Sequence, residues 1–194
     1  MASTLLINLD AHPEARDLIA RMILAYGELE FVMLDTLGAV LNDTSTALRT
    51  IYQLRSESNR LSVVEAIATP WFDRAGLGGA IREAITAVYH CKNIRNQYAH
   101  CQWLDDERIL RFCLLDQSAK SKAGMAEIIA RPVSLSLLQQ QWAYFDYADH
   151  ALLWVNHQYR VKNEQPTHTD GPVPKPKRLS PPKLDSRGEK RSPR

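Results

Sequence analysis

The sequence predicts an all-α fold: a bundle of four to five helices, with a small β-hairpin after the third long helix and a disordered C-terminal tail. Three observations lead to this prediction. Apolar residues recur every three or four positions over long stretches. Two short apolar stretches lie on either side of an acidic turn. The residues from 162 onward are rich in proline and basic side chains.

The first helix is predicted over residues 14–41. Its apolar face comprises Leu18, Met22, Tyr26, Leu29, Met33, Leu37 and Val40. A second helix is predicted over 44–68. It should end at Thr69 and Pro70, because the residue before a proline avoids the helical region. Residues 71–79 are then expected to form a loop.

A third helix is predicted over residues 80–98, with an apolar face that becomes polar toward its end. Residues 103–115 are predicted to form two short strands around the acidic turn Asp105–Glu107. Residues 117–132 are expected to be a loop or irregular helix, and 134–160 the last helix. The apolar face of that helix is Leu135, Leu138, Trp142, Phe145, Leu152, Val155 and Tyr159.

Composition divides the chain into a helical domain over 1–161 and a Pro-rich basic tail over 162–194. The tail holds nine basic and four acidic residues and seven of the ten prolines, so it should not bury enough apolar surface to fold alone. The tail either keeps the protein soluble or, through residues 175–178, attracts nucleic acid or an acidic partner. The domain itself is slightly acidic, which disfavours broad nonspecific binding of nucleic acid.

The sequence favours a cytoplasmic protein. Its first residues lack the basic region of a secretory signal, and no apolar run is long enough to span a membrane. Cys91, Cys101 and Cys113 are odd in number and match no zinc spacing, so reduced thiols are expected. The histidines form no set with metal-ligand spacing, and neither a metal nor another cofactor is expected.

The segment that carries chemistry is residues 95–100, Arg-Asn-Gln-Tyr-Ala-His, at the end of the third helix. On a straight helix Arg95 and His100 point about 140° apart. They share one pocket only if the helix frays near Ala99, if the arginine reaches around it, or if a partner chain contributes. A simpler interpretation is that these side chains cap the last carbonyls of the helix.

Arg95, Asn96 and His100 resemble the motif of the HEPN family: an arginine, often followed by a polar residue, with a histidine four to six positions later. The resemblance covers the helical architecture of roughly residues 14–160 and six residues of motif. It implies a metal-independent endoribonuclease that acts on RNA as a homodimer. It also implies a role in defence or a toxin–antitoxin system, with a cognate antitoxin or regulatory protein as partner.

The resemblance also implies roles for the motif residues. His100 acts as general acid or base on the ribose 2′-hydroxyl or the leaving oxygen, for which imidazole suits neutral pH. Arg95 holds the scissile phosphate and stabilises its developing charge. Asn96 orients His100 or contacts the phosphate. Gln102 stands where some toxins of the family carry a tyrosine that a partner enzyme modifies, so that form of regulation is not expected here.

Two residues are candidates for supporting roles. Glu30 lies among apolar neighbours on the first helix and needs a partner if it is buried, and Arg95 is one candidate. Glu30 at an exposed helix edge is an equally open alternative, and Glu28 is a weaker candidate. Tyr98 lies inside the motif without an assigned role. Two other functions stay open: a non-catalytic helical dimerisation module that binds a protein or RNA partner, and a purely structural bundle.

Overall fold

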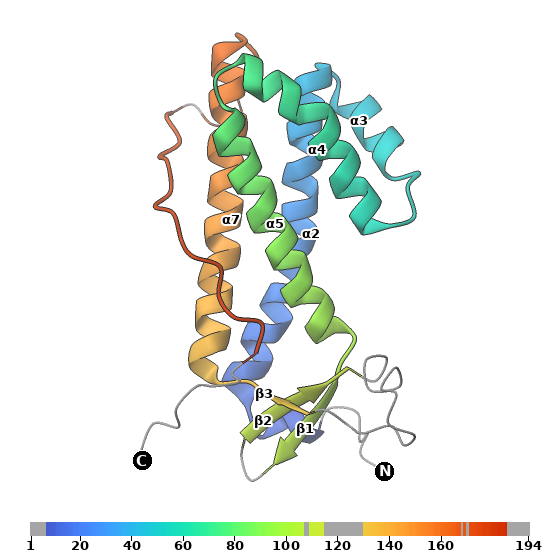
Figure 1. Ribbon diagram of the computed structural model, residues 1–194, viewed down its shortest axis with the longest axis vertical. Helices are drawn as coiled ribbons and strands as arrows, with labels where there is room; N and C mark the ends of the chain where they lie inside the picture. The colour runs from blue at the N-terminus through green and yellow to red at the C-terminus, as the bar shows by residue number, and fades with distance from the viewer. Residues whose placement is uncertain (1–6, 107–108, 115–129, 168, 170, 186–194) are drawn as a thin grey trace. The chain divides into compact units, whose positions relative to one another are not determined.

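The computed structural model describes residues 7–106, 109–114, 130–167, 169 and 171–185. It is mostly helical with one small antiparallel sheet, as predicted (Figure 1). The helices are α1 (Ile7–Asp10), α2 (Pro13–Leu41), α3 (Thr44–Ile51), α4 (Glu57–Arg74), α5 (Gly78–Ala99) and α7 (Leu135–Lys162). The strands are β1 (Gln102–Asp106), β2 (Ile109–Cys113) and β3 (Arg131–Pro132).

The chain divides into two compact units. The first comprises Met1–Leu24, Lys92–Ala143 and Pro182–Arg194, and we call it the motif unit because it contains residues 95–100. The second comprises Ala25–Cys91 and Tyr144–Pro181, and we call it the helical unit. Helices α2, α5 and α7 each contribute residues to both units.

In the helical unit, α2 ends and α3 begins where the sequence predicts. Asn42 adopts a φ of 52°, the left-handed conformation that often follows a helix and that asparagine tolerates. Asp43 is the N-cap of α3, and its carboxylate accepts a hydrogen bond from the Thr46 amide at 3.0 Å. The prediction that Asn42 and Asp43 separate two helices is therefore confirmed.

The prediction of one helix over 44–68 is wrong, because the structure has two. Helix α3 stops at Ile51, and α4 starts after Ser56. The Ser56 hydroxyl accepts from the Asn59 amide at 3.5 Å, so a second N-cap starts a new helix inside a continuous apolar pattern. The periodicity of Leu54 and Leu61 concealed this break.

The predicted stop at Pro70 is also wrong, since α4 continues to Arg74 and includes the first residues of the predicted loop. Pro70 and Ala66 are both exposed, so water can satisfy the Ala66 carbonyl that the proline leaves without a helical donor. The real stop is Gly76, whose φ is 71°, and the following Leu77 amide donates to the Phe72 carbonyl at 2.8 Å.

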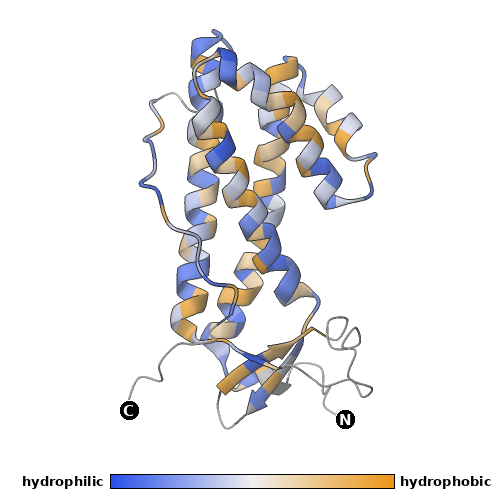
Figure 2. Ribbon diagram, viewed as in Figure 1, coloured by the Kyte–Doolittle hydropathy of each residue, from blue (hydrophilic) through white to orange (hydrophobic). Residues whose placement is uncertain are grey.

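The core of the helical unit consists of apolar side chains from all of its helices. Figure 2 shows polar and apolar residues mixed along each long helix. Phe72 of α4 stacks on Tyr159 of α7 with ring centroids 4.4 Å apart. The largest fully buried side chains of the unit are Tyr26, Phe72, Phe145, Leu29, Met33, Leu34, Leu37, Ile51, Leu61 and Ile81. No helix in the described part of the chain is long and apolar enough to cross a membrane.

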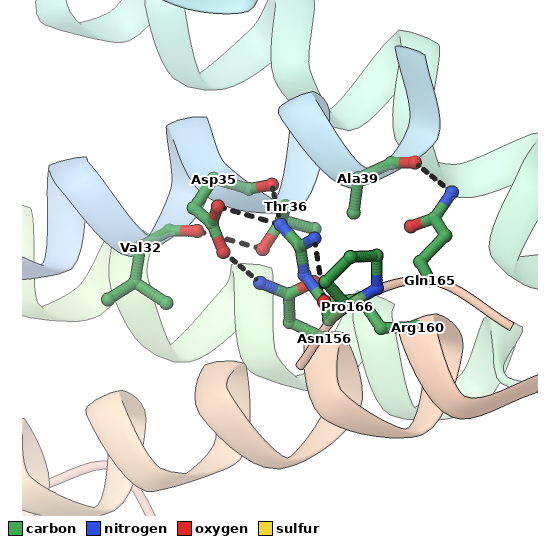
Figure 3. A network of polar contacts seen from close by, with 8 residues as sticks. All are labelled: Val32, Asp35, Thr36, Ala39, Asn156, Arg160, Gln165 and Pro166. Atoms are coloured by element: carbon green, nitrogen blue, oxygen red, sulfur yellow. Dashed lines mark hydrogen bonds and ion pairs between the residues drawn. The ribbon is translucent and has the colours of Figure 1, made fainter. Parts of the chain in front are cut away.

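A polar network lies buried in the helical unit, between α2 and α7 (Figure 3). The Asp35 carboxylate accepts from Arg160 Nη2 at 2.7 Å and from Asn156 Nδ2 at 2.5 Å. Beyond α7, the Gln165 amide donates to the Ala39 carbonyl at 2.9 Å. Asp35, Asn156 and Arg160 are all buried. The Asp35 carboxylate and the Arg160 guanidinium therefore stabilise each other's charge in place of water.

The motif unit contains the sheet, and the predicted hairpin is confirmed. Strands β1 and β2 pair antiparallel with Asp106 opposite Ile109. The predicted acidic turn is wrong at Asp105 and Asp106, which belong to β1, and its third residue Glu107 lies outside the described residues. Most of the loop predicted over 117–132 lies outside the described residues, and its end forms the strand β3, which pairs with β2. Tyr98, Trp103 and Phe112 pack their rings 5.5–5.9 Å apart between helix and sheet.

The last helix is confirmed, and most of the residues predicted for its apolar face are buried, namely Leu138, Phe145, Leu152, Val155 and Tyr159. The Ser134 hydroxyl caps α7 by accepting from the Leu137 amide at 3.1 Å. Leu135, assigned to the apolar face, is 37% exposed, whereas Gln141 is fully buried. Buried polar side chains thus interrupt the face that α7 turns inward.

The tail has no helix or strand in residues 163–167, 169 and 171–185, as its composition predicts. It nevertheless contacts the helical unit. The Lys175 ammonium lies 4.9 Å from the centre of the Trp154 ring, and Arg178 Nε lies 3.1 Å from Glu83 Oε1. These exposed contacts are individually weak.

We predict that Asp35→Ala lowers the free energy of unfolding by about 3–5 kcal/mol, because it leaves the Arg160 guanidinium buried without that carboxylate. Asp17→Ala is the matched control. Asp17 and Arg21 form an exposed pair on α2, and its loss should cost about 0.3–0.5 kcal/mol. Urea unfolding followed by circular dichroism measures both values. Equal losses for the two variants would contradict the structural role of the network.

Candidate functional site

The motif occupies the last turn of α5 and the residue that follows it. The helix ends at Ala99, and His100 lies in a turn with its side chain exposed. Arg95 and Asn96 are half-buried. His100 is thus the first residue beyond α5, so the helix ends near Ala99 as joint action of Arg95 and His100 within one chain would require.

Arg95 is held by its neighbour in the sequence. Its Nη1 atom donates to the Asn96 side-chain oxygen at 2.7 Å. The Nε atom of Arg95 is shielded from solvent. Asn96 thus holds one terminal nitrogen of the guanidinium, a contact that differs from the predicted one with His100 or phosphate.

Tyr98 is the buried anchor of the motif. Its hydroxyl donates to Gln141 Oε1 of α7 at 2.6 Å. Burial raises the pKa of the Tyr98 phenol far above its usual value, and the Asp185 carboxylate acts in the same direction, while the hydrogen bond to Gln141 opposes them. The phenol therefore stays protonated and remains a donor throughout the physiological range.

The amide of Gln141 connects the motif to the C-terminal tail. With its oxygen bound by Tyr98, its Nε2 atom donates to the carbonyls of Lys183 at 2.8 Å and Leu184 at 3.4 Å. Gln97 of α5 donates to the same Leu184 carbonyl at 2.6 Å. Two side-chain amides from different helices therefore hold two consecutive backbone carbonyls of the tail.

A buried carboxylate ends this part of the tail. Asp185 is 7% exposed, and its Oδ2 atom lies 3.9 Å from Arg131 Nη1 of β3. A carboxylate shielded from water requires cations or donors around it. The motif unit thus already accommodates one anionic group close to Tyr98.

Glu30, the predicted supporting carboxylate, has a partner in the helical unit. Its Oε1 atom accepts from Arg60 Nη1 of α4 at 2.9 Å, and both side chains are mostly buried. The Arg60 guanidinium also lies 5.0 Å from the centre of the Tyr52 ring. The prediction that Glu30 needs a partner is consistent with this pair, and the contact gives Glu30 a structural role in joining α2 to α4.

Three residues of this site escaped the sequence-based prediction: Gln97, Gln141 and Asp185. Gln141 carried a signal, because it lies three residues after Leu138 and four before Phe145, on an otherwise apolar helical face. Gln97 lies inside the motif but carries no catalytic chemistry. Asp185 follows a proline-rich stretch, and nothing local indicates that it is buried.

The site has no built-in metal centre in the described residues: no group of three or more His, Cys, Asp or Glu side chains is placed to hold a metal ion there. The three cysteines are free thiols. Burial raises the pKa of Cys101, which directly follows the motif, to about 12, so it is a poor nucleophile near neutral pH.

No protein-family model matches the chain, and neither a curated protein nor a solved structure is significantly similar to it.

We predict that Tyr98→Phe lowers the free energy of unfolding by about 1–3 kcal/mol, because it leaves the buried Gln141 oxygen without its donor. Tyr52→Phe is the control, since the Tyr52 side chain is mostly exposed and should tolerate the change within about 0.5 kcal/mol. Urea unfolding measures both. A Tyr98→Phe protein as stable as the control would show that this bond does not anchor the motif.

Proposed function

We propose that the protein is a HEPN-like, metal-independent endoribonuclease in which Arg95 and His100 act together across a homodimer. The observation that carries this proposal is the end of α5 at Ala99, which leaves His100 exposed in a turn just beyond Arg95. The resemblance of the motif supplies the reaction class, and the geometry supports it by giving an accessible imidazole and a positioned guanidinium in one unit.

The proposed reaction uses the RNA's own 2′-hydroxyl as the nucleophile. One imidazole removes the proton from this hydroxyl, and the 2′-oxygen attacks the adjacent phosphorus. The bond from phosphorus to the 5′-oxygen breaks, and a second imidazole donates a proton to the leaving oxygen. One histidine cannot serve both roles at once, so His100 of each subunit in a dimer provides one of them.

Arg95 is proposed to stabilise the negative charge that develops on the phosphate oxygens. A guanidinium suits this role because its planar donors match the spacing of phosphate oxygens. The bond to Asn96 makes Asn96 a positioning residue for Arg95. A guanidinium held in place before RNA binds loses less conformational freedom when it does.

By the same resemblance, we propose a defence or toxin–antitoxin role in the cytoplasm, with a cognate antitoxin or regulatory protein as partner. A second candidate is a non-catalytic module that dimerises and binds a protein or RNA. The shielding of Arg95 Nε and the engagement of Nη1 by Asn96 favour this candidate, since both reduce the guanidinium surface open to a phosphate.

We predict that His100→Ala and Arg95→Ala each slow RNA cleavage by about 10²–10³-fold, the range for losing a general acid–base group or a charge-stabilising donor. Arg95→Lys should recover only part of the loss, because an ammonium lacks the planar fork. The measurement is the rate of cleavage of mixed cellular RNA by purified full-length protein in the presence of a chelator.

His150→Ala and Arg82→Ala are the controls, since both residues are exposed in the helical unit. Thermal unfolding should confirm that all five proteins fold. Wild-type cleavage that persists in His100→Ala would remove His100 from the mechanism. A wild-type protein that binds RNA without cutting it would favour the non-catalytic module.

A further inference from the structure

The tail residues Pro182–Asp185, here called the terminal segment, contact the motif unit in the way that a bound peptide contacts a receptor. The segment has neither helix nor strand. Its hydrogen bonds to Gln97 and Gln141 use backbone carbonyls of the segment. Such bonds recognise the peptide backbone itself, whatever side chains it carries.

Gln141, which binds the terminal segment, is held in its orientation by Tyr98. Gln141 is fully buried, and the Tyr98 hydroxyl occupies its oxygen, so its two N–H donors are directed to the carbonyls of Lys183 and Leu184. The bond to Tyr98 therefore sets which way the amide faces independently of the segment's carbonyls.

The terminal segment, by contrast, is poorly buried. Leu184 is 38% exposed and Lys183 is exposed, so neither side chain is enclosed in the core. Asp185 is the only buried side chain of the segment, and Arg131 faces it. Pro181 and Pro182 stiffen the backbone just before the contact, which lowers the entropy lost on binding.

We propose that Gln97, Gln141 and Arg131 form a peptide-binding site, and that its ligand is the chain's own terminal segment, bound reversibly. The site selects a backbone that presents two successive carbonyl acceptors followed by a carboxylate. Because Gln97 follows Asn96 directly, the bound segment lies beside the motif. Any effect of the bound segment on RNA cleavage rests on the proposed function. The binding of the segment does not.

The test uses full-length proteins and a fluorescent peptide with the sequence of residues 178–186. Asp185→Lys in the protein places a cation beside Arg131. This weakens the binding of the chain's own terminal segment, so the site becomes accessible to the peptide. We expect this variant to bind the peptide at least tenfold more tightly than the wild type in fluorescence anisotropy. Glu164→Lys, which makes the same charge change at an exposed tail position, should behave like the wild type.

The amides are tested by adding Gln97→Leu or Gln141→Leu to Asp185→Lys, and each should weaken peptide binding at least tenfold. Two separate variants guard against a folding defect at buried Gln141, and thermal unfolding monitors both. A peptide carrying Asp185→Lys should not compete. Equal peptide binding by Asp185→Lys and Glu164→Lys, or binding that survives loss of either amide, would overturn the proposal.

Cleavage assays on the same proteins separate the two proposals. If the terminal segment restricts access to the motif, Asp185→Lys should cut RNA faster than Glu164→Lys does. Peptide binding with no cleavage by any protein would remove the nuclease and leave the peptide site. RNA cleavage that His100→Ala abolishes, with no peptide binding by any protein, would remove the peptide site and leave the nuclease.

Discussion

The hydrogen bond between the Tyr98 phenol and the Gln141 amide is the constraint on which the motif unit depends. It joins α5 to α7 at 2.6 Å in an environment that excludes water, and it decides where the remaining donors of Gln141 point. The exposed half of the motif, His100, follows two residues after this anchor. A rigid buried residue therefore positions an accessible one, an arrangement that suits a site that must hold its geometry while contacting solvent.

The same bond directs the donors of Gln141 to the tail, which few contacts hold. A hydrogen bond contributes a net stabilisation of about 0.5–1.5 kcal/mol, whereas ordering the backbone of one residue costs about 1–2 kcal/mol. The amides of Gln97 and Gln141 make three such bonds to the segment, and Asp185 adds a charge contact with Arg131. These few contacts do not outweigh the cost of ordering the segment by a wide margin, which is why we propose that it binds reversibly.

Much of the fold could be predicted from sequence because helical periodicity and helix caps are local. The limits of α2, α5 and α7 follow from such signals, as does the hairpin. The division into α3 and α4 could not be predicted in this way, because an apolar pattern that spans the break gives no reason to stop. Pro70 misled the prediction, since its cost depends on whether the Ala66 carbonyl can reach water, which only the structure shows.

The site was predictable where it consists of one short segment and not where it joins distant ones. Arg95, Asn96 and His100 stand together in the chain, and their residue types indicate phosphate chemistry. The bond from Asn96 to Arg95 and the contacts of Gln141 and Asp185 depend on tertiary packing. A composition rich in proline and lysine describes the tail's lack of helix and strand correctly, but it cannot show that Lys183, Leu184 and Asp185 contact α5, α7 and β3.

The ends of the RNA products test the central claim most directly, because attack by the 2′-hydroxyl leaves a distinctive pair of ends. Mass spectrometry of RNA cut by the wild-type protein in a chelator should find a 2′,3′-cyclic phosphate on one fragment and a 5′-hydroxyl on the other. Fragments with a 3′-hydroxyl and a 5′-phosphate, or RNA that remains intact, would contradict the assignment of Arg95 and His100 to this reaction.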